Sequence, residues 1–354
     1  MRRSLAIALS LFFSLGLLAQ MHDHAVPRAV TLEEGLGNEH FAVTTSNEDA
    51  QRFFDQGMRY VYAFNHDEAV RSFTHAGELD PNLAMAWWGS ALALGPNINL
   101  DVDPDREKQA YDAVQTAQTK YSRASEKERD LIDALAKRYT NDPSADLHKL
   151  GEDYSHAMAA VAKKYPDDPD INTLYAESMM DLRPWKFWSH DGKPAEGTEE
   201  IVGVLHGVLK DHPNHIGANH YLIHAVEASP NPAEAVMSAQ RLKTLAPSAG
   251  HLVHMPAHIY QRTGNYSGAA EANVSGAVSA STPSPRSRKS ASTCGTGSSA
   301  TTSHDGRPAF SRAPSFATTP RRLASTPTKS STNSAVCFRL AIDAPIASSR
   351  RRRS

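Results

Sequence analysis

The stretch from Pro213 to Tyr266 reads PNHIGANHYLIHAVEASPNPAEAVMSAQRLKTLAPSAGHLVHMPAHIYQRTGNY and contains two histidine pairs, His220/His224 and His254/His258. The members of each pair are four residues apart, which places both rings on one face of a helix. The second pair follows the first by 34 residues, since 254 − 220 and 258 − 224 both equal 34. A fixed period of this length indicates a helical repeat. The sequence therefore predicts that the four imidazoles recur at equivalent places in two successive repeats.

A complete repeat is visible earlier, where residues 50–81 read AQRFFDQGMRYVYAFNHDEAVRSFTHAGELDP. This segment resembles the tetratricopeptide repeat (TPR) family. Gly57 and Tyr60 match the small and aromatic positions of the first helix of the repeat. The positions of the second helix and its terminating proline are matched by Ala69, Phe73, Ala76 and Pro81. Small residues let paired helices approach closely, and proline stops a helix.

The resemblance implies an all-α fold, a TPR-type α-solenoid in which antiparallel helix pairs form a right-handed superhelix. We expect the solenoid to span residues 46–273. Further units open at Ala84, Ile216 and Gly250. The tryptophans are expected to pack in the core and between repeats: Trp87, Trp88, Trp185 and Trp188.

The amino terminus has the features of a secretory signal peptide. Residues 1–19 hold two arginines followed by an apolar run, and that run is shorter than the ~20 residues of a spanning helix. Cleavage after Ala19 is expected, with an uncleaved anchor helix as the alternative. The chain then resembles a secreted bacterial TPR protein, periplasmic or extracellular, without stable membrane insertion after cleavage. Residues 20–45 form a polar lead-in segment.

The composition changes abruptly after Asn273. Residues 274–354 are rich in Ser, Thr, Pro and Arg and hold 13 Lys/Arg and 2 Asp/Glu, which leaves 24 basic and 37 acidic residues in the remainder of the chain. We interpret this segment as a basic tail that is either disordered or the product of a reading-frame shift. Its basic character does not lead us to expect nucleic-acid binding. Both cysteines, Cys294 and Cys337, lie in this tail, so the fold is expected to depend on its core and not on disulfides.

TPR proteins bind ligands mainly on the concave surface lined by the first helix of each repeat. The resemblance therefore implies a ligand groove in the carboxyl-terminal repeats. Its expected residues are His220, His224, Glu227, His251, His254, His258 and Arg262, with Glu177 and Asp181 from the preceding helix.

Three roles for these histidines remain open. They can form a surface that binds a protein or peptide partner, which is the interpretation we favour from the sequence. They can instead bind zinc or copper through His220, His224, His254 and His258, because imidazole suits both ions. Glu227 would then be an extra ligand or would orient the rings. The third role is structural, with the imidazoles satisfying buried backbone groups.

Catalysis is not expected from the sequence. A metal-dependent hydrolase needs an open coordination position and a placed general base, and Glu227 is the only obvious base near the histidines. The residues predict an exported TPR scaffold, with no cofactor firmly indicated and zinc or copper as the candidates. The alternative is a zinc- or copper-binding protein, with metal-dependent hydrolysis as a further activity.

Overall fold

The computed structural model describes residues 29–281. Its helices belong to one compact unit that starts at Leu32. Between residues 29 and 281 there is no β-strand, only two isolated bridges, so the predicted all-α class is confirmed. The α-helices are α1 Glu48–Tyr62, α2 His66–Leu79, α3 Ala84–Leu94, α4 Pro104–Gln118, α5 Glu126–Leu135, α6 Leu147–Lys164, α7 Pro169–Met180, α8 Thr198–Asp211, α9 Ile216–Val226, α10 Val236–Leu245, α11 Gly250–His254, α12 Pro256–Arg262 and α13 Tyr266–Ser281. Two short 3-10 helices are η1 Tyr121–Arg123 and η2 Pro232–Ala235.

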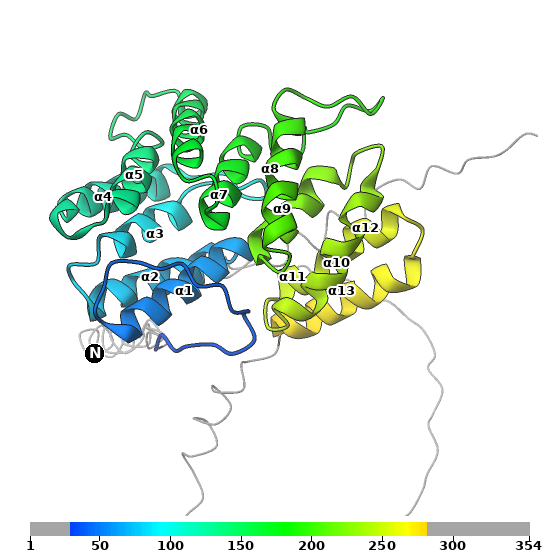
Figure 1. Cartoon of the computed structure of the whole chain (residues 1–354), viewed down its shortest axis with the longest axis horizontal. Coiled ribbons are helices and arrows are strands. Elements are labelled where there is room, and N and C mark those ends of the chain that lie inside the picture. Colours follow the sequence, from blue (N-terminus) through cyan, green and yellow to red (C-terminus); the bar gives the residue numbers. More distant parts are fainter. Residues whose placement is uncertain (1–28, 282–354) are drawn as a thin grey trace, which may run out of the picture. The chain divides into compact units, whose positions relative to one another are not determined.

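Each helix packs against its neighbours in the chain (Figure 1). The seam between the first helices illustrates why. A Cβ added at Gly57 of α1 would lie 2.4 Å from the ring of Phe73 in α2, and one added at Gly89 of α3 would lie 2.6 Å from the same ring. Because these two glycines have no side chain, α1 and α3 can both pack closely on Phe73 of α2. Phe73 is fully buried, as are Ala69 and Ala76.

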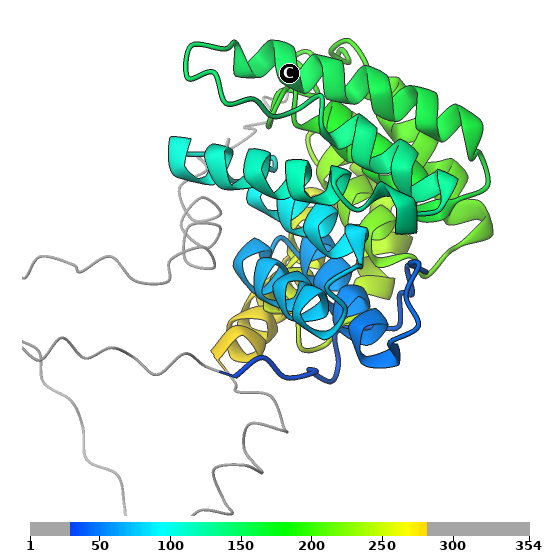
Figure 2. The same ribbon diagram turned by 90° about the vertical axis from the view of Figure 1, so that its left-hand side faces the viewer.

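The described part of the lead-in segment before α1 packs on the helices (dark blue in Figures 1 and 2). Although it is polar in composition, Leu36 and Phe41 are buried. Glu39 accepts a hydrogen bond from the backbone N–H of Ile216 at 2.7 Å, and Thr44 donates one to Glu128 at 2.6 Å. The segment therefore ties the beginning of the chain to α5 and α9, which its composition alone did not indicate.

The end of α1 packs directly on α9. Gly217 of α9 leaves room for the Tyr62 ring, because a Cβ at position 217 would lie 2.5 Å from that ring. The Tyr62 hydroxyl donates to Asp170 at 2.6 Å, at the start of α7. The first helix thus covers the side of α9 that carries the histidines.

The helix that begins at Gly250 is interrupted at Pro256, where α11 ends and α12 begins. Proline has no N–H to donate, so the regular hydrogen bonding breaks at this position. Helix α13 then continues to Ser281, eight residues beyond the boundary expected at Asn273. The signal peptide, the cysteines and residues 282–354 of the tail lie outside the described residues.

The tryptophans differ in their environments. Trp88 is buried and donates to the carbonyl of Leu131 at 3.1 Å, as expected of a core residue. Trp185 is 47% exposed and has a positive φ of 63°, so it departs from the expected core role. Over residues 29–281, no helix combines the length and the apolar character that crossing a membrane requires.

Candidate metal centre

Helix α9 carries His220 and His224 on one face, and both side chains are buried. Glu227 follows as the C-cap residue of the same helix, one turn after His224. The four-residue and three-residue spacings place the two rings and the carboxylate in a row along α9.

Helices α11 and α12 bring three more histidines to this row: His251, His254 and His258. The interruption at Pro256 leaves the second pair together, since the rings of His254 and His258 are 4.9 Å apart, centroid to centroid. The same distance separates His220 from His251, and His224 lies 5.5 Å from His258. The five rings therefore form one continuous group, which we call the histidine cluster.

In four of these rings the Nδ1 atom has a polar partner. His220 Nδ1 donates to the backbone carbonyl of Tyr62 at 2.7 Å, and His254 Nδ1 donates to Oδ1 of Asn273 at 2.6 Å. His224 and His258 both bond to Glu227, at 2.9 and 2.5 Å. Because each acceptor is a carbonyl, amide or carboxylate oxygen, the proton of each neutral ring lies on Nδ1 and the lone pair on Nε2.

The Nε2 atoms face one another. His220 Nε2 is 3.0 Å from His251 Nε2, and His258 Nε2 is 3.0 Å from His254 Nε2. The Nε2 of His224 is buried and has no hydrogen-bond partner within the described part of the chain. A buried acceptor without a partner is costly, so the centre of the cluster is a place where a positive group would be stabilised.

Glu227 is the anion of the cluster. Burial alone would raise its pKa, but His258 and His224 outweigh burial and hold the pKa of Glu227 well below its usual range. The pKa of His258 is raised because attraction to Glu227 exceeds the effect of burial. Glu227 is therefore a carboxylate whose two oxygens each accept one imidazole N–H.

The other four rings are held neutral. Burial, followed by repulsion from neighbouring histidines, lowers the pKa of His220 and His251. Burial likewise lowers the pKa of His224, and it lowers that of His254 to about 4. Neutral imidazole is the form that ligates metal ions.

Aromatic side chains enclose the cluster. Phe64, whose φ is +53°, lies 4.5 Å from the ring of His220 and stacks on His224 at 5.9 Å. Trp185 meets His224 edge-on at 5.3 Å. The strained backbone of both aromatic residues marks them as positioned parts of the site.

Three expected groove residues lie away from the cluster. Arg262 is exposed at the end of α12. Glu177 and Asp181 belong to a second buried polar cluster, in which Arg138 contacts Asp181 at 2.6 Å. The tightest group of ligand atoms consists of His220, His224 and His251, all within 4.8 Å of one another, whereas the sequence suggested His254 and His258 in place of His251.

Several contributors to the site could not be recognised in the sequence. Phe64 and the Tyr62 carbonyl come from the first helix pair and carry no local signal. Asn273 is the last residue of the expected repeat pattern and lies in α13, which packs on α11. Its spacing from His254 follows no period of the repeat.

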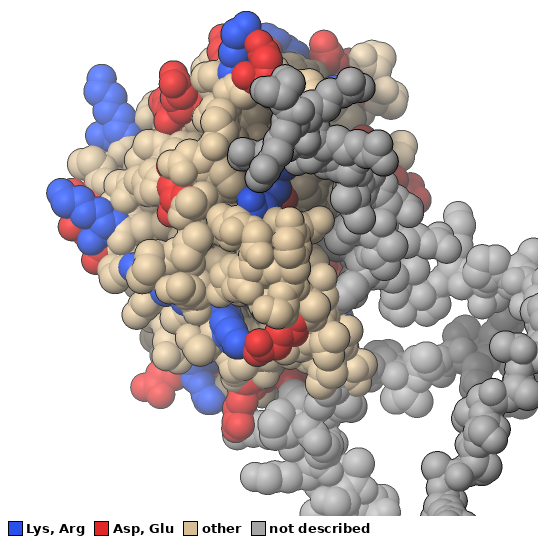
Figure 3. Space-filling view, turned by 90° about the vertical axis from the view of Figure 1, so that its right-hand side faces the viewer, with Lys and Arg blue, Asp and Glu red and all other residues tan. Residues whose placement is uncertain are grey.

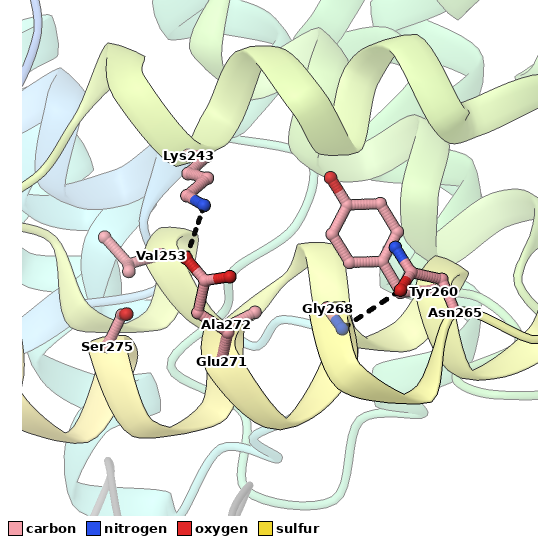
Figure 4. Close-up of a pocket in the computed structure, with 8 residues that line it drawn as sticks. All are labelled: Lys243, Val253, Tyr260, Asn265, Gly268, Glu271, Ala272 and Ser275. Atoms are coloured by element: carbon pink, nitrogen blue, oxygen red, sulfur yellow. Dashed lines mark hydrogen bonds and ion pairs between the residues drawn. The ribbon is translucent and has the colours of Figure 1, made fainter.

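A separate shallow cavity of about 150 Å³ lies between α10, α12 and α13 (Figure 4). The ion pair between Lys243 and Glu271 spans its rim, with Nζ and Oε1 2.6 Å apart. None of the histidines lines it. This cavity is therefore separate from the histidine cluster.

No protein-family model matches the chain, and no curated protein matches it either.

Proposed function

We propose that this protein binds a transition-metal ion, zinc or copper, through the Nε2 atoms of His220, His224 and His251. The observation that carries the proposal is the convergence of three imidazoles, two buried and one partly buried, whose ligand atoms lie within 4.8 Å of one another. Two of the three rings direct their Nδ1–H groups to the Tyr62 carbonyl and to Glu227, which leaves their Nε2 lone pairs for a cation.

The distances suit such an ion. Two nitrogens that bind one ion at ~2.0–2.1 Å lie about 2.9 to 3.4 Å apart for bond angles between about 90° and 110°. The Nε2 atoms of His220 and His251 are 3.0 Å apart. The ligand atom of His224 lies within 4.8 Å of both, so a movement of this ring would complete the set.

The surroundings of the rings also support the proposal. Metal-binding histidines almost always donate their other ring N–H to a carboxylate or a backbone carbonyl, which fixes ring orientation and raises basicity. The Tyr62 carbonyl and Glu227 provide both kinds of acceptor here. Imidazole nitrogens suit zinc and copper and are poor ligands for magnesium or calcium.

Binding is better supported than hydrolysis. A hydrolytic metal site needs a general base that can reach the attacking water. Both oxygens of Glu227 already accept imidazole N–H groups, and the histidines that line the centre would be occupied as ligands. Glu227 therefore acts as a support for the rings.

Isothermal titration of the metal-stripped protein with zinc, and separately with copper, tests the proposal. We expect the parent to bind at least one equivalent of metal, and the double variant His220→Ala, His224→Ala to lose the ion held by His220, His224 and His251. The matched control is His148→Ala, because His148 is 64% exposed and lies in α6 outside the cluster. Binding that is equal in all three proteins, or absent in the parent, would contradict the proposal.

We also infer that the helix pairs form a TPR-type right-handed solenoid that serves as an exported scaffold for a protein or peptide partner. The support is the burial of TPR-matching residues, Phe73 above all, at helix contacts. A peptide on the surface would reach His251, His258 and Arg262, because the other three histidines are at most 2% exposed. Amino-terminal sequencing of protein from the periplasm, starting at Gln20, would support export, and retention of Met1 in the cytoplasm would oppose it.

A nucleic-acid partner is not proposed. On the face shown in Figure 3, Lys and Arg side chains of the described residues alternate with Asp and Glu and leave broad neutral areas between them. Nucleic-acid surfaces need a continuous basic patch.

A further inference from the structure

We propose that the histidine cluster holds two metal ions, with His254 and His258 providing a second site beside that of His220, His224 and His251. This inference rests on the proposed metal-binding function and extends it to a binuclear centre. The chemical class of ligand at the second position is again a zinc or copper ion.

The second pair has the same kind of supporting contacts as the first group. His254 directs its Nδ1–H to Asn273 and His258 directs its Nδ1–H to Glu227. The two Nε2 atoms then face each other across 3.0 Å. That distance fits a shared proton in an N–H···N hydrogen bond, and it also matches two ligands of one ion that replaces the proton.

A single ion cannot hold all five rings in this arrangement. Two ligands of one ion are at most about 4.2 Å apart, twice the ~2.1 Å bond length. Among the described residues, the only group of three or more ligand atoms within 4.8 Å of one another is His220, His224 and His251. His254 and His258 do not join it, so a second ion is required if they bind metal.

Glu227 connects the two sites. One of its oxygens accepts the N–H of His224, from the first site, and the other accepts that of His258, from the second. The carboxylate therefore orients one ring in each site and places a negative charge beside both ions. Neither metal site then needs a carboxylate of its own.

The two sites differ in the number of protein ligands. Each has one partly exposed ring, His251 in the first site and His258, whose side chain is 19% exposed, in the second. The second site has only two protein ligands, so it would complete its coordination from solvent. A site of that kind exchanges its ion more readily than one with three protein ligands.

The test is the stoichiometry of zinc. The full chain is stripped with a chelator, dialysed against excess zinc chloride, and measured for zinc per chain by mass spectrometry under non-denaturing conditions. We expect two ions in the parent and in the exposed control His148→Ala, and one in His254→Ala and in His258→Ala. His258→Gln provides a second variant, because glutamine keeps a hydrogen-bond donor for Glu227 without an imidazole nitrogen.

The outcomes separate the two claims. One ion in the parent would overturn the binuclear centre and leave the proposed function standing. Two ions that persist in His258→Ala and His258→Gln would also overturn it, because the second ion would lie elsewhere. No bound zinc and no bound copper in the parent would overturn both.

Discussion

Two buried polar clusters among the described residues balance the negative charge of their carboxylates in different ways. Around α7, Arg138 lies 2.6 Å from Asp181 with Glu177 close by, and all three are largely buried. Around α9, Glu227 contacts two of the five clustered histidines, His224 and His258, and the hydrogen bonds and ring contacts described above include no lysine or arginine. The first cluster carries its own permanent cation, and the second has only imidazoles.

This difference bears on which cluster can take up an exchangeable cation. A buried carboxylate needs a partner of opposite charge. Arg138 is always charged and stays bound to the fold, so the α7 cluster has a permanent cation, although Arg138 Nη1, Glu177 Oε2 and Asp181 Oδ1 are buried without a hydrogen-bond partner among the described residues. The histidine cluster can gain its positive charge from protons or from a metal ion, and both are exchangeable with solvent.

Removing the cation from the α7 cluster should have the largest effect on stability. Arg138→Met keeps much of the side-chain volume but leaves Asp181 and Glu177 buried without a cation, and breaking such a pair costs about 3–5 kcal/mol. Urea unfolding measures the change. The control is Arg183→Met, which removes an exposed pair with Glu196 and should cost at most about 1 kcal/mol. Equal effects of the two substitutions would show that the α7 pair is not structural.

Acid should destabilise the metal-free protein through the histidine cluster. The folded pKa values of His220, His224, His251 and His254 are lowered, to about 4 for His254. The unfolded chain therefore binds more protons between pH 6.5 and 4, and stability is present above pH ~6.5 and lost as the pH falls towards 4. His258, with a raised pKa, opposes this change with a single group.

The net loss between pH 7.5 and 5.5 should be on the order of 3 kcal/mol, given about 1.4 kcal/mol per unit of pKa shift for each group. Urea unfolding at the two pH values, with chelator present, measures it. His220→Leu combined with His224→Leu should flatten the dependence. A parent protein equally stable at both pH values would mean that the rings are not held neutral.

Metal should stabilise the histidine cluster and leave the α7 cluster unaffected. Zinc at about 100 times its Kd adds about 2.7 kcal/mol, which raises the Tm by roughly 5 to 10 °C for a domain of this size. Differential scanning calorimetry with zinc or chelator measures the shift. Arg138→Met should show the same shift from its lower starting Tm. If the shift disappeared in this variant, the ion would bind at the α7 cluster and not at the histidine cluster.

Glu227 should tune metal affinity without being required for it. In Glu227→Gln the amide cannot accept both N–H groups as a carboxylate does, and loss of such a supporting contact weakens metal binding about 10–100-fold. Glu234→Gln is the matched control, since Glu234 contacts His206 on the surface. Competition with a zinc-binding dye measures both affinities, and equal affinities would show that Glu227 has no part in the site.

The sequence predicted the helices and the grouping of the histidines better than it predicted their surroundings. A spacing of four residues predicts which rings share a helix face, and the period of 34 residues predicts that the two pairs recur in neighbouring helices. The structure places His220, His224, His254 and His258 in one group. Periodicity says nothing about which distant helix covers that face. The Tyr62 carbonyl, Phe64 and Asn273 reach the cluster through tertiary packing alone.

Local features also overrode the repeat pattern. Pro256 divides one expected helix into α11 and α12, and this break accompanies the approach of His251 to His220. The lead-in segment is polar on average, yet two apolar side chains and Glu39 are enough to anchor it. Helix α13 continues to Ser281 although its last residues are poor in large apolar side chains.

Crystals grown with zinc, measured on both sides of the zinc absorption edge, test the central claim most directly. We predict an anomalous peak about 2.0–2.1 Å from the Nε2 atoms of His220, His224 and His251. Anomalous peaks confined to exposed residues such as His148, with the five buried rings free of metal, would contradict the account.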